Sequence, residues 1–304
     1  MIEKAFILAA GYGTRLRPMT NFIPKPLFPI VGRPAIEIVM SWINRFGVMD
    51  FHINAHHLSS KLNSAFDNGT LVPSDANANL IIERNEILGT AGGLGNLFHS
   101  AAEPDCTILI HNGDVIESFD LDSTYRKHIE HGAAVTMLLV NNHTKNSVVT
   151  ENDAVVRFSK GMGLTYSGVA FMEPEVLKSF PDDKFASITD CLEQWIETRS
   201  VMGLEMNGFW CDFGTPELYL GLHKDILVRN LHPDIVIDGT QWISPNAKIH
   251  SDSIIDGFVA IGDGAEIPDK CRLENCIVWD RTVVPSANYR NAIITPYAIV
   301  NVDK

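Results

Sequence analysis

The chain is 304 residues long, which allows one large domain or two unequal ones at ~100–200 residues per domain. Lys and Arg number 24 and Asp and Glu number 37, so the formal net charge is −13, and such a surface repels a phosphate backbone or an anionic membrane. Hydrophobic residues make up 45% of the chain, which excludes disorder as its main state and predicts a sizeable core.

Membrane and export signals are weak. The longest apolar run, Ala133–Val140, is far shorter than the ~20 residues of a membrane helix, and the apolar stretch near the N-terminus is too short for a signal peptide. The five cysteines form no C-x-x-C pair and indicate free thiols in a reducing compartment. We therefore expect a cytoplasmic protein with no membrane or nucleic-acid partner.

Apolar runs alternate with helical patterns from Ala5 to about His131. Short runs predict strands, and these are Phe6–Ala10, Phe51–Asn54, Leu80–Ile82 and Thr107–Ile110. Apolar residues at helical spacing predict a helix from Pro34 to Gly47 and another near Leu58–Phe66. This order predicts an α/β fold with right-handed crossovers and a mostly parallel sheet, which binds ligands beyond the carboxyl ends of its strands.

The last quarter of the chain has a period of six. An aliphatic or aromatic residue recurs at Ile243, Ile249, Ile255, Ile261, Ile267, Leu273 and Trp279. Four residues after each comes a mostly small or β-branched one, at Ala247, Ser253, Val259, Ala265, Cys271, Ile277 and Val283. The pattern predicts a parallel β-helix with both sets pointing inward. We place the domains at residues 1–231 and 232–304.

About two coils are too few to stand alone. We therefore expect the tail to pack on the first domain or on another subunit, and the protein to be a homo-oligomer, most simply a dimer.

A glycine-rich turn, Gly11–Thr20, follows the first predicted strand. Its backbone N–H groups can close on phosphate oxygens, because glycine has no Cβ. Arg15 in the turn and Lys25 ten residues later can grip a polyphosphate from two sides. Leu16 excludes the dinucleotide fingerprint, and no Gly-Lys-Ser/Thr P-loop is present. The plain alternative is a tight turn with exposed basic residues.

This segment resembles the sugar-1-phosphate nucleotidyltransferases, whose signature is G-x-G-T-R-L-x-P-x-T…P-K-P after an L-A-A strand. The resemblance implies a Rossmann-like domain that joins a nucleoside triphosphate to a sugar 1-phosphate and releases pyrophosphate, followed by a short left-handed β-helix. It implies that the nucleotide is bound by Ala9, Ala10, Gly11, Gly13 and Thr14. It also implies that Arg15 holds the departing pyrophosphate and that Lys25 contacts the α-phosphate.

Two carboxylates are candidate metal ligands. Asp114 ends the Asn112-Gly113-Asp114 turn after a predicted strand, where its oxygens suit a hard divalent cation, although such a sequence is often only a turn. Asp212 precedes a helix start with Thr215 as N-cap. The resemblance implies that Asp114 and Asp212 hold Mg²⁺, and that Gly113 lies at the nucleotide.

The reaction needs no protein nucleophile, because a sugar phosphate is already an oxyanion near neutral pH. Catalysis then consists of in-line positioning and charge neutralisation, which we assign to Arg15, Lys25 and Asp114.

The segment Glu86–Gly93 resembles the E-P-L-G-T-A-G of the guanylyltransferase branch, with Ile87 in place of proline. Glu86 can accept hydrogen bonds from N1–H and the amine of guanine, or it is merely solvated. Gly89 and Thr90 are the nucleotide contacts that the resemblance implies here. The segment favours GTP over UTP.

The sugar side gives weaker signals. Lys160 is the nearest match to the lysine of the family's E-K-P and is equally well a surface lysine, and Gly168 could admit the sugar ring. Ser187–Asp190 resembles the family's E-I-T-D or only caps a helix. His52, His56 and His57 indicate polar loop residues rather than zinc ligands.

We expect a Mg²⁺-dependent enzyme that takes GTP and a mannose-like or heptose 1-phosphate. The alternative is a uridylyltransferase that takes UTP and an amino-sugar, muramic acid or glucose 1-phosphate. A choline-phosphate cytidylyltransferase is more remote. A non-catalytic regulatory subunit is disfavoured because Arg15, Lys25, Asp114 and Asp212 are all present.

Overall fold

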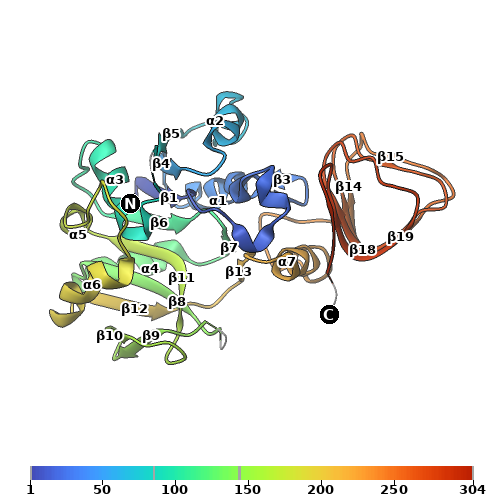
Figure 1. The fold of residues 1–304 in the computed structure, drawn as a ribbon. Helices are drawn as coiled ribbons and strands as arrows, with labels where there is room; N and C mark the ends of the chain where they lie inside the picture. Colours follow the sequence, from blue (N-terminus) through green and yellow to red (C-terminus); the bar gives the residue numbers. More distant parts are fainter. Residues whose placement is uncertain (1, 85, 143–144, 303–304) are drawn as a thin grey trace. The chain divides into compact units, whose positions relative to one another are not determined.

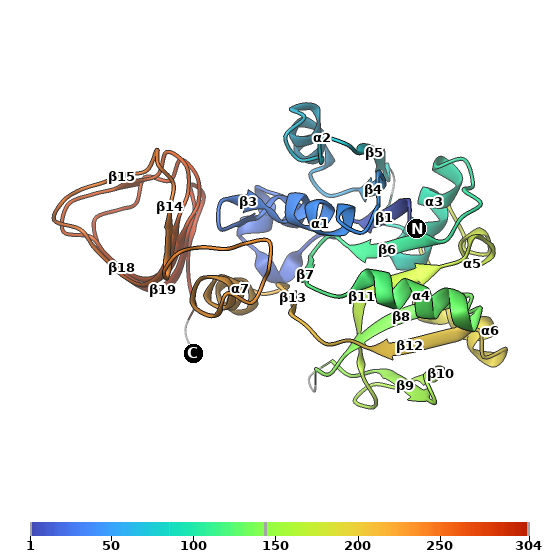
Figure 2. The ribbon, with the colours of Figure 1, turned by 180° about the vertical axis from the view of Figure 1, so that it is seen from behind.

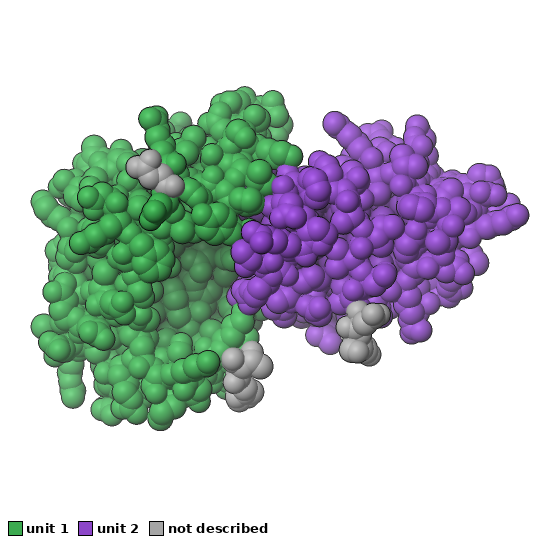
Figure 3. Space-filling view, in the orientation of Figure 1, with its two compact units in different colours: residues 1–12, 39–210 green, residues 13–38, 211–304 purple. Residues whose placement is uncertain are grey.

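The computed structural model describes residues 2–84, 86–142 and 145–302. The chain forms two compact units that are not consecutive in sequence (Figure 3). Unit 1 consists of residues 1–12 and 39–210, and unit 2 of residues 13–38 and 211–304. All of residues 232–304 lie in unit 2, together with residues 13–38 and 211–231, and the predicted domain division at residue 231 stays a prediction.

Unit 1 is built on one large sheet (Figure 1). Within the described residues, nine strands pair in the order β5-β4-β1-β6-β11-β8-β12-β10-β9. Their bounds are β1 (Lys4–Leu8), β4 (Asp50–Ala55), β5 (Asn77–Ile82), β6 (Ile108–Asn112), β8 (Val135–Val140), β9 (Val148–Glu151), β10 (Ala154–Phe158), β11 (Thr165–Met172) and β12 (Val201–Glu205). Only β11 and β10 run against the others in this sheet, so the predicted α/β fold with a mostly parallel sheet is confirmed.

Helices connect and cover these strands. They are α1 (Ala35–Asn44), which begins in unit 2, α2 (Ser59–Asp67), α3 (Gly89–Ser100), α4 (Leu121–His131), α5 (Pro174–Lys178) and α6 (Ile188–Glu197). The two helices predicted before residue 70 are confirmed as α1 and α2. The first strand ends at Leu8, two residues before its predicted end, because the N–H of Ala9 bonds to the Asn54 side chain of β4 instead of to the backbone of a neighbouring strand.

The parallel strands end at one edge of the sheet. Leu8 of β1 lies opposite Asn54 of β4 and Asn112 of β6, and Ala55 of β4 lies opposite Ile82 of β5. The loops that follow β1, β4, β5 and β6 therefore emerge side by side, as expected for a ligand-binding edge. The short strand β7 (Val115–Glu117) continues from the turn after β6.

Unit 2 contains the tail. Its described residues form a mostly parallel five-stranded sheet, β14-β16-β18-β19-β20, and a two-stranded sheet, β15-β17. The bounds are β14 (Gln241–Ile243), β15 (Lys248–Ile249), β16 (Ile254–Ile261), β17 (Glu266–Ile267), β18 (Arg272–Val278), β19 (Asn288–Ile294) and β20 (Ile299–Asn301). Figures 1 and 2 show this part of the chain winding in stacked coils.

The remaining elements of unit 2 are the hairpin of β2 (Pro29–Ile30) and β3 (Arg33–Pro34) and the helix α7 (Pro216–Arg229). The strand β13 (Trp210–Asp212) carries the chain from unit 1 into unit 2.

The six-residue period holds from Ala247 to Leu273 and then shifts, while Ile243 at its start is 39% exposed, against the prediction. The predicted inward residues that lie in or against the buried core of the tail are Ala247, Ile249, Ile255, Val259, Ile261, Ala265, Ile267, Cys271 and Leu273. After Leu273 the prediction is wrong: Cys276 and Val278 enter this core in place of Ile277, and Val284 enters it in place of Val283, which is 70% exposed.

A β-bulge causes the shift. Asp256 pairs with Glu274, 18 residues on, but Val259 pairs with Cys276, 17 residues on, so Gly257 and Phe258 face a single residue of β18. Loss of one residue moves the side chains that follow to the opposite face of a strand.

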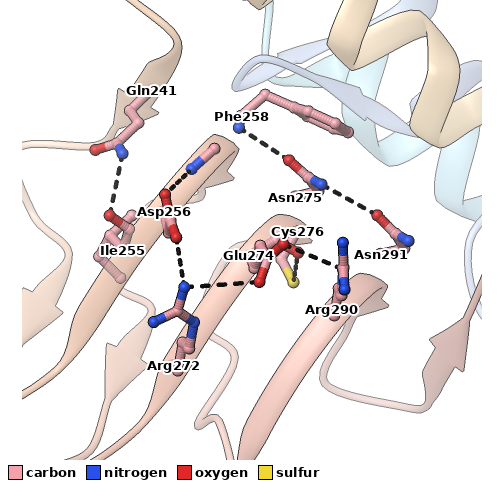
Figure 4. Close-up of polar contacts among 11 residues, drawn as sticks. Gln241, Ile255, Asp256, Phe258, Arg272, Glu274, Asn275, Cys276, Arg290 and Asn291 are labelled. Carbon is pink, nitrogen blue, oxygen red and sulfur yellow. Dashed lines mark hydrogen bonds and ion pairs between the residues drawn. The ribbon is translucent and has the colours of Figure 1, made fainter.

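A stack of residues fills the bulged corner (Figure 4). Gly257, Asn275 and Asn291 all have positive φ, between 50° and 66°, which glycine and asparagine tolerate. The side chain of Asn275 accepts a hydrogen bond from the Phe258 N–H at 3.3 Å and donates one to Asn291 at 3.2 Å. The stack satisfies polar groups of consecutive coils where the ladder is interrupted.

The tail packs on other parts of unit 2. Helix α7 contacts β16, β18 and β19. Trp279 was predicted to point into the tail, but its Nε1–H donates to Tyr219 of α7 at 3.1 Å and its ring lies 4.8 Å from that of Phe28. Tyr297 stacks on Phe22 at 4.4 Å. The expectation that the tail packs on residues of the predicted first domain is thus confirmed.

No helix in the described part of the chain is long and apolar enough to cross a membrane. None of the five cysteines, all of which are described, forms a disulfide.

Candidate active site

The first half of the glycine-rich turn belongs to unit 1. The Ala9 N–H donates to Asn54 Oδ1 at 2.7 Å, and the Gly113 N–H donates to the Leu8 carbonyl at 2.9 Å. Gly11 is exposed, and a Cβ there would meet nothing within 4 Å. The backbone at Gly11 is therefore open to a ligand while its flank is fixed.

The second half of the turn belongs to unit 2. Gly13 has φ 59°, and a Cβ there would lie 2.7 Å from Thr20 Cγ2, so the position requires glycine. The Thr20 hydroxyl donates to the Gly13 carbonyl at 2.9 Å. The short 3₁₀ helix Thr14–Leu16 follows and leaves Thr14 and Arg15 exposed.

Three predicted residues come together in unit 2. Lys25 is only 6% exposed, and its Nζ lies 3.5 Å from Asp212 Oδ1 and 4.7 Å from the centre of the Phe213 ring. A Cβ at Gly214 would lie 2.6 Å from Arg15 Nη2 and 2.9 Å from Asp212 Oδ1. Arg15 and Asp212 thus meet at Gly214, and Lys25 lies on the same Asp212 carboxylate; two cations and one carboxylate arranged in this way can bind phosphate oxygens and a divalent cation.

Helix α7 begins directly after this cluster. Thr215 is its N-cap, and the hydroxyl accepts a hydrogen bond from the Leu218 N–H at 3.3 Å, as predicted. The Thr215 hydroxyl also lowers the pKa of Glu217 in the first turn. The cap residue, three residues after Asp212, fixes where the helix begins.

A second group of predicted residues lies in unit 1. Asp114 is partly buried at the end of the Asn112–Asp114 turn. Gly168 of β11 has φ 89°, and a Cβ there would lie 2.6 Å from Asn112 Nδ2, so Gly168 lies against this turn. Asp114 and Asp212 belong to different units, and a metal ion shared by them stays a prediction.

The predicted base loop follows β5 in unit 1. Glu86 is exposed, and Gly89 and Thr90 form the first turn of α3. Leu88 just before it is buried, its N–H donates to Glu83 Oε2 at 3.0 Å, and its carbonyl accepts from the Ala186 N–H at 2.9 Å. The loop is therefore held at Leu88 and open at Glu86.

The two residues predicted to bind the sugar phosphate, Lys160 and Gly168, lie in different parts of unit 1. Lys160 is exposed and lines a cavity of about 580 Å³ together with residues of β10 and α6, Thr189 and Asp190 among them. Thr189 and Asp190 belong to the segment that resembles E-I-T-D, so the described lining brings Lys160 together with part of that segment. Gly168 instead neighbours the Asn112–Asp114 turn.

His56 and His57 lie in the loop after β4, as predicted, but His52 lies within β4 and is buried, so the loop prediction is wrong for His52. His56 contacts Tyr12 through a hydrogen bond of 3.2 Å, and His57 packs on the same ring at 5.7 Å. Buried His52 pairs with Asp50 at 3.3 Å. No cluster of three His, Cys, Asp or Glu side chains suited to a metal occurs in the described ranges.

Mg²⁺ is commonly held by one or two carboxylates together with water and substrate phosphates, and Asp114 and Asp212 each offer one such carboxylate. Asn54, Glu83 and Phe213 were not predicted to belong to the site. Asn54 and Glu83 carry the one available signal, a polar residue at or just after the end of a predicted strand.

Comparison with known proteins identifies the family of the chain. Residues 4–229 match the family described as "Nucleotidyl transferase". The chain is 26% identical to the UTP–glucose-1-phosphate uridylyltransferase of Synechocystis over 97% of this chain and 83% of that protein. It is 25% identical to the mannose-1-phosphate guanylyltransferase of Mycobacterium tuberculosis over 91% and 79%.

A solved structure shows the same fold. The crystal structure of HddC from Yersinia pseudotuberculosis, complexed with GMP-PN, superimposes with a TM-score of 0.61. The match is 23% identical and covers 73% of this chain and 98% of that one.

Proposed function

The chain belongs to the nucleotidyl transferase family, and from this premise we propose that the enzyme joins a nucleoside triphosphate to a sugar 1-phosphate and releases pyrophosphate. The observation that carries the proposal is the cluster of Arg15 and Asp212 at Gly214, with Lys25 against the same Asp212. Fixed cations beside a carboxylate suit a reaction in which phosphates are both the nucleophile and the leaving group.

The proposed reaction is a displacement at the α-phosphorus. An oxygen of the sugar phosphate attacks the α-phosphorus in line, a new P–O bond forms, and the bond to the bridging oxygen of the β-phosphate breaks with its electron pair leaving on pyrophosphate. Positioning and electrostatics supply the catalysis, as in other phosphoryl-type transfers.

Each basic residue has its own part in this proposal. Lys25 is buried against Asp212 and Phe213, so its ammonium is a fixed point charge for the α-phosphate. Arg15 is exposed at the glycine-rich turn and offers a planar fork of donors to the departing pyrophosphate. The backbone at Gly11 and Gly13 approaches the same phosphates, because no Cβ intervenes there.

We propose Mg²⁺ as the cofactor, with Asp114 and Asp212 as its protein ligands. When bound, the ion neutralises charge on the phosphates of both substrates. Asp212 also lies beside Lys25, so it orients the ammonium as well.

We propose GTP as the preferred nucleotide, with a mannose-like or heptose 1-phosphate. Glu86 is exposed at the base loop, where a carboxylate can accept from both N–H groups of the guanine edge. UTP with an amino-sugar, muramic acid or glucose 1-phosphate is the second candidate, because the similar proteins include a uridylyltransferase as well as a guanylyltransferase.

A matrix of four nucleoside triphosphates against a panel of sugar 1-phosphates, read by pyrophosphate release, tests the proposal. The panel contains mannose, heptose, glucose, N-acetylglucosamine and N-acetylmuramic acid 1-phosphates. Release that needs both substrates supports the reaction, and the best pair identifies base and sugar. No release in any well, with a folded protein and Mg²⁺ present, would contradict it.

We further propose that the tail is a short left-handed parallel β-helix and that the protein is a dimer. Paired residues 18 apart, such as Gln241 with Val259 and Ile249 with Ile267, support a coil of three six-residue sides. Exposed aliphatic residues on the tail, Ile254 and Val283 among them, support self-association. Sedimentation velocity measures the oligomeric state, and a monomer at all concentrations would contradict the dimer.

A further inference from the structure

Glu83 is a buried carboxylate with no part in the proposed reaction. It follows β5 directly and is 5% exposed. Both of its oxygens accept hydrogen bonds: Oε1 from Asn54 Nδ2 at 2.6 Å, and Oε2 from the Leu88 N–H at 3.0 Å. Burial of a carboxylate is costly unless such donors compensate it, so its presence needs a reason.

The hydrogen bonds of Glu83 lead to both candidate substrate loops. On one side, Asn54 uses its Oδ1 to accept the Ala9 N–H at 2.7 Å, at the start of the glycine-rich turn. On the other side, Leu88 precedes the first turn of α3, which carries Gly89 and Thr90. We call the start of the glycine-rich turn, Ala9–Tyr12, the phosphate loop, and Glu86–Thr90 the base loop. Asn54 and Glu83 thus connect the phosphate loop to the base loop, and all of these residues lie in unit 1.

A parallel connection runs through the backbone of the same residue. The Glu83 carbonyl lies 2.8 Å from His56 Nδ1, and His56 Nε2 lies 3.2 Å from the hydroxyl of Tyr12 in the glycine-rich turn. With Nδ1 donating to the carbonyl, Nε2 of the neutral ring accepts from Tyr12. Two independent contacts therefore join Glu83 to the phosphate loop.

Gly93 of helix α3 leaves space for the side chains of Asn54 and Glu83. A Cβ at Gly93 would lie 2.7 Å from Asn54 Nδ2 and 3.2 Å from Glu83 Oε1. Any larger side chain there would displace both groups.

We propose that Asn54 and Glu83 are positioning residues that hold the phosphate loop and the base loop at a fixed separation, so that one nucleotide can occupy both. The roles of the two loops rest on the proposed function, whereas the connection itself does not. Asn54 and Glu83 act through Ala9 and Leu88 and touch no reacting atom.

An exchange of the two side-chain types tests the connection. Glu83→Gln leaves one of the two donors, Asn54 Nδ2 or the Leu88 N–H, facing an amide nitrogen, and Asn54→Asp places two carboxylates against each other. The double variant N54D/E83Q restores donor and acceptor at every step with the same net charge, because the introduced glutamine donates to the introduced aspartate and accepts from Leu88. Glu173→Gln is the control, because Glu173 accepts from Thr107 at 2.6 Å before β6, at the opposite end of the parallel strands.

The first readout is amide hydrogen exchange, which needs no turnover. Each single variant is expected to raise exchange ~10-fold or more in the segments that contain Ala9 or Leu88, the control to leave both unchanged, and the double variant to restore protection. Unchanged exchange in both single variants would overturn the proposal even in an active enzyme.

The second readout is kinetic. Each single variant is expected to lower kcat/KM for GTP or UTP by ~10- to 100-fold, as for loss of a buried hydrogen bond to a charged group, and the double variant to recover to within ~3-fold of the starting enzyme. Losses that merely add in the double variant would overturn the proposal. If the starting enzyme itself releases no pyrophosphate, the proposed function fails, and hydrogen exchange alone decides the connection.

Discussion

Lys25 and Asp212 show how single residues set the electrostatics of the candidate site. They are 187 positions apart in the chain, yet their charged atoms lie 3.5 Å apart, and the Lys25 ammonium also faces the Phe213 ring. A buried cation needs such partners to offset its desolvation. The position of this charge is therefore fixed before any phosphate binds.

Lys25→Ala is expected to lower kcat by ~100-fold or more, because the charge on the α-phosphate is lost, and Lys25→Arg is expected to recover only part of it. Arginine places a planar fork where the site holds a point charge. Steady-state pyrophosphate release measures both variants, with circular dichroism as the check on folding. Full recovery of kcat in Lys25→Arg would show that only a positive charge, and not the shape of the lysine ammonium, is needed at this position.

Asp114→Asn and Asp212→Asn test the shared metal ion. If both carboxylates hold one Mg²⁺, each variant loses most turnover, and the double variant is little worse than either single one, as for residues that act as a unit. The measurement is kcat/KM across a Mg²⁺ titration. Additive losses would contradict a shared ion.

Gly214 offers a test that leaves every charge in place. Its Cβ in Gly214→Ala would lie 2.6 Å from Arg15 Nη2 and 2.9 Å from Asp212 Oδ1, the ends of two side chains, so Arg15 and Asp212 move while the fold remains. We expect ~10-fold lower kcat and unchanged stability. Gly221→Ala in α7 is the matched control, because a Cβ there meets nothing within 4 Å. Equal activity of both variants would show that the positions of Arg15 and Asp212 at Gly214 do not matter to the reaction.

At the scale of elements, helix α7 contains a buried histidine, His223, that joins it to the β2–β3 hairpin. His223 is fully buried: its Nδ1–H donates to the Tyr219 carbonyl at 3.0 Å, and Nε2 accepts from the Val31 N–H at 3.3 Å. Only the neutral ring can accept. Burial lowers the pKa of His223 to about 4, against about 6.5 in the unfolded chain.

This pKa predicts a pH dependence of stability. Between pH 6.5 and 4 the unfolded chain binds the proton of His223 and the folded chain does not, so this contribution is fully present above pH 6.5 and is lost as pH falls toward 4. The loss is about 3 kcal/mol. Urea unfolding from pH 7 to pH 4 measures it against His223→Gln, whose amide can make both hydrogen bonds without titrating. Parallel pH curves for the two proteins would show that His223 is not the cause.

At the scale of the whole molecule, the tail and the basic residues of the site share unit 2. Trp279 of the tail packs on Phe28, three residues after Lys25, and on Tyr219 of α7. The stability of the segment that carries Arg15 and Lys25 therefore depends on a residue more than 250 positions away.

Trp279→Ala is expected to destabilise the protein by about 3–5 kcal/mol, as for other large cavities, and to lower turnover below the unfolding temperature. Trp279→Phe keeps the ring packing, loses the hydrogen bond to Tyr219, and is expected to cost about 1 kcal/mol. Thermal unfolding and pyrophosphate release on both variants check this. Full activity in a destabilised Trp279→Ala protein would show that packing of the tail does not affect the positions of Arg15 and Lys25.

The sequence alone determined what depends on neighbouring residues. Alternating apolar runs and helical spacing predicted β1, α1, β4, α2, β5 and β6, and the motif around Gly11–Arg15 was sufficient to indicate the family. Local patterns are readable because side-chain periodicity and glycine turns act over a few residues.

Only the tertiary structure decided contacts between distant residues. It brought Lys25 to Asp212 and joined Asn54 to Glu83 and Leu88, for which no local pattern exists. It also placed the bulge at Gly257 and Phe258, which turned Cys276 inward and left Val283 exposed. Whether one strand gains a residue over its neighbour depends on how the two strands pair, and pairing is a property of the folded chain.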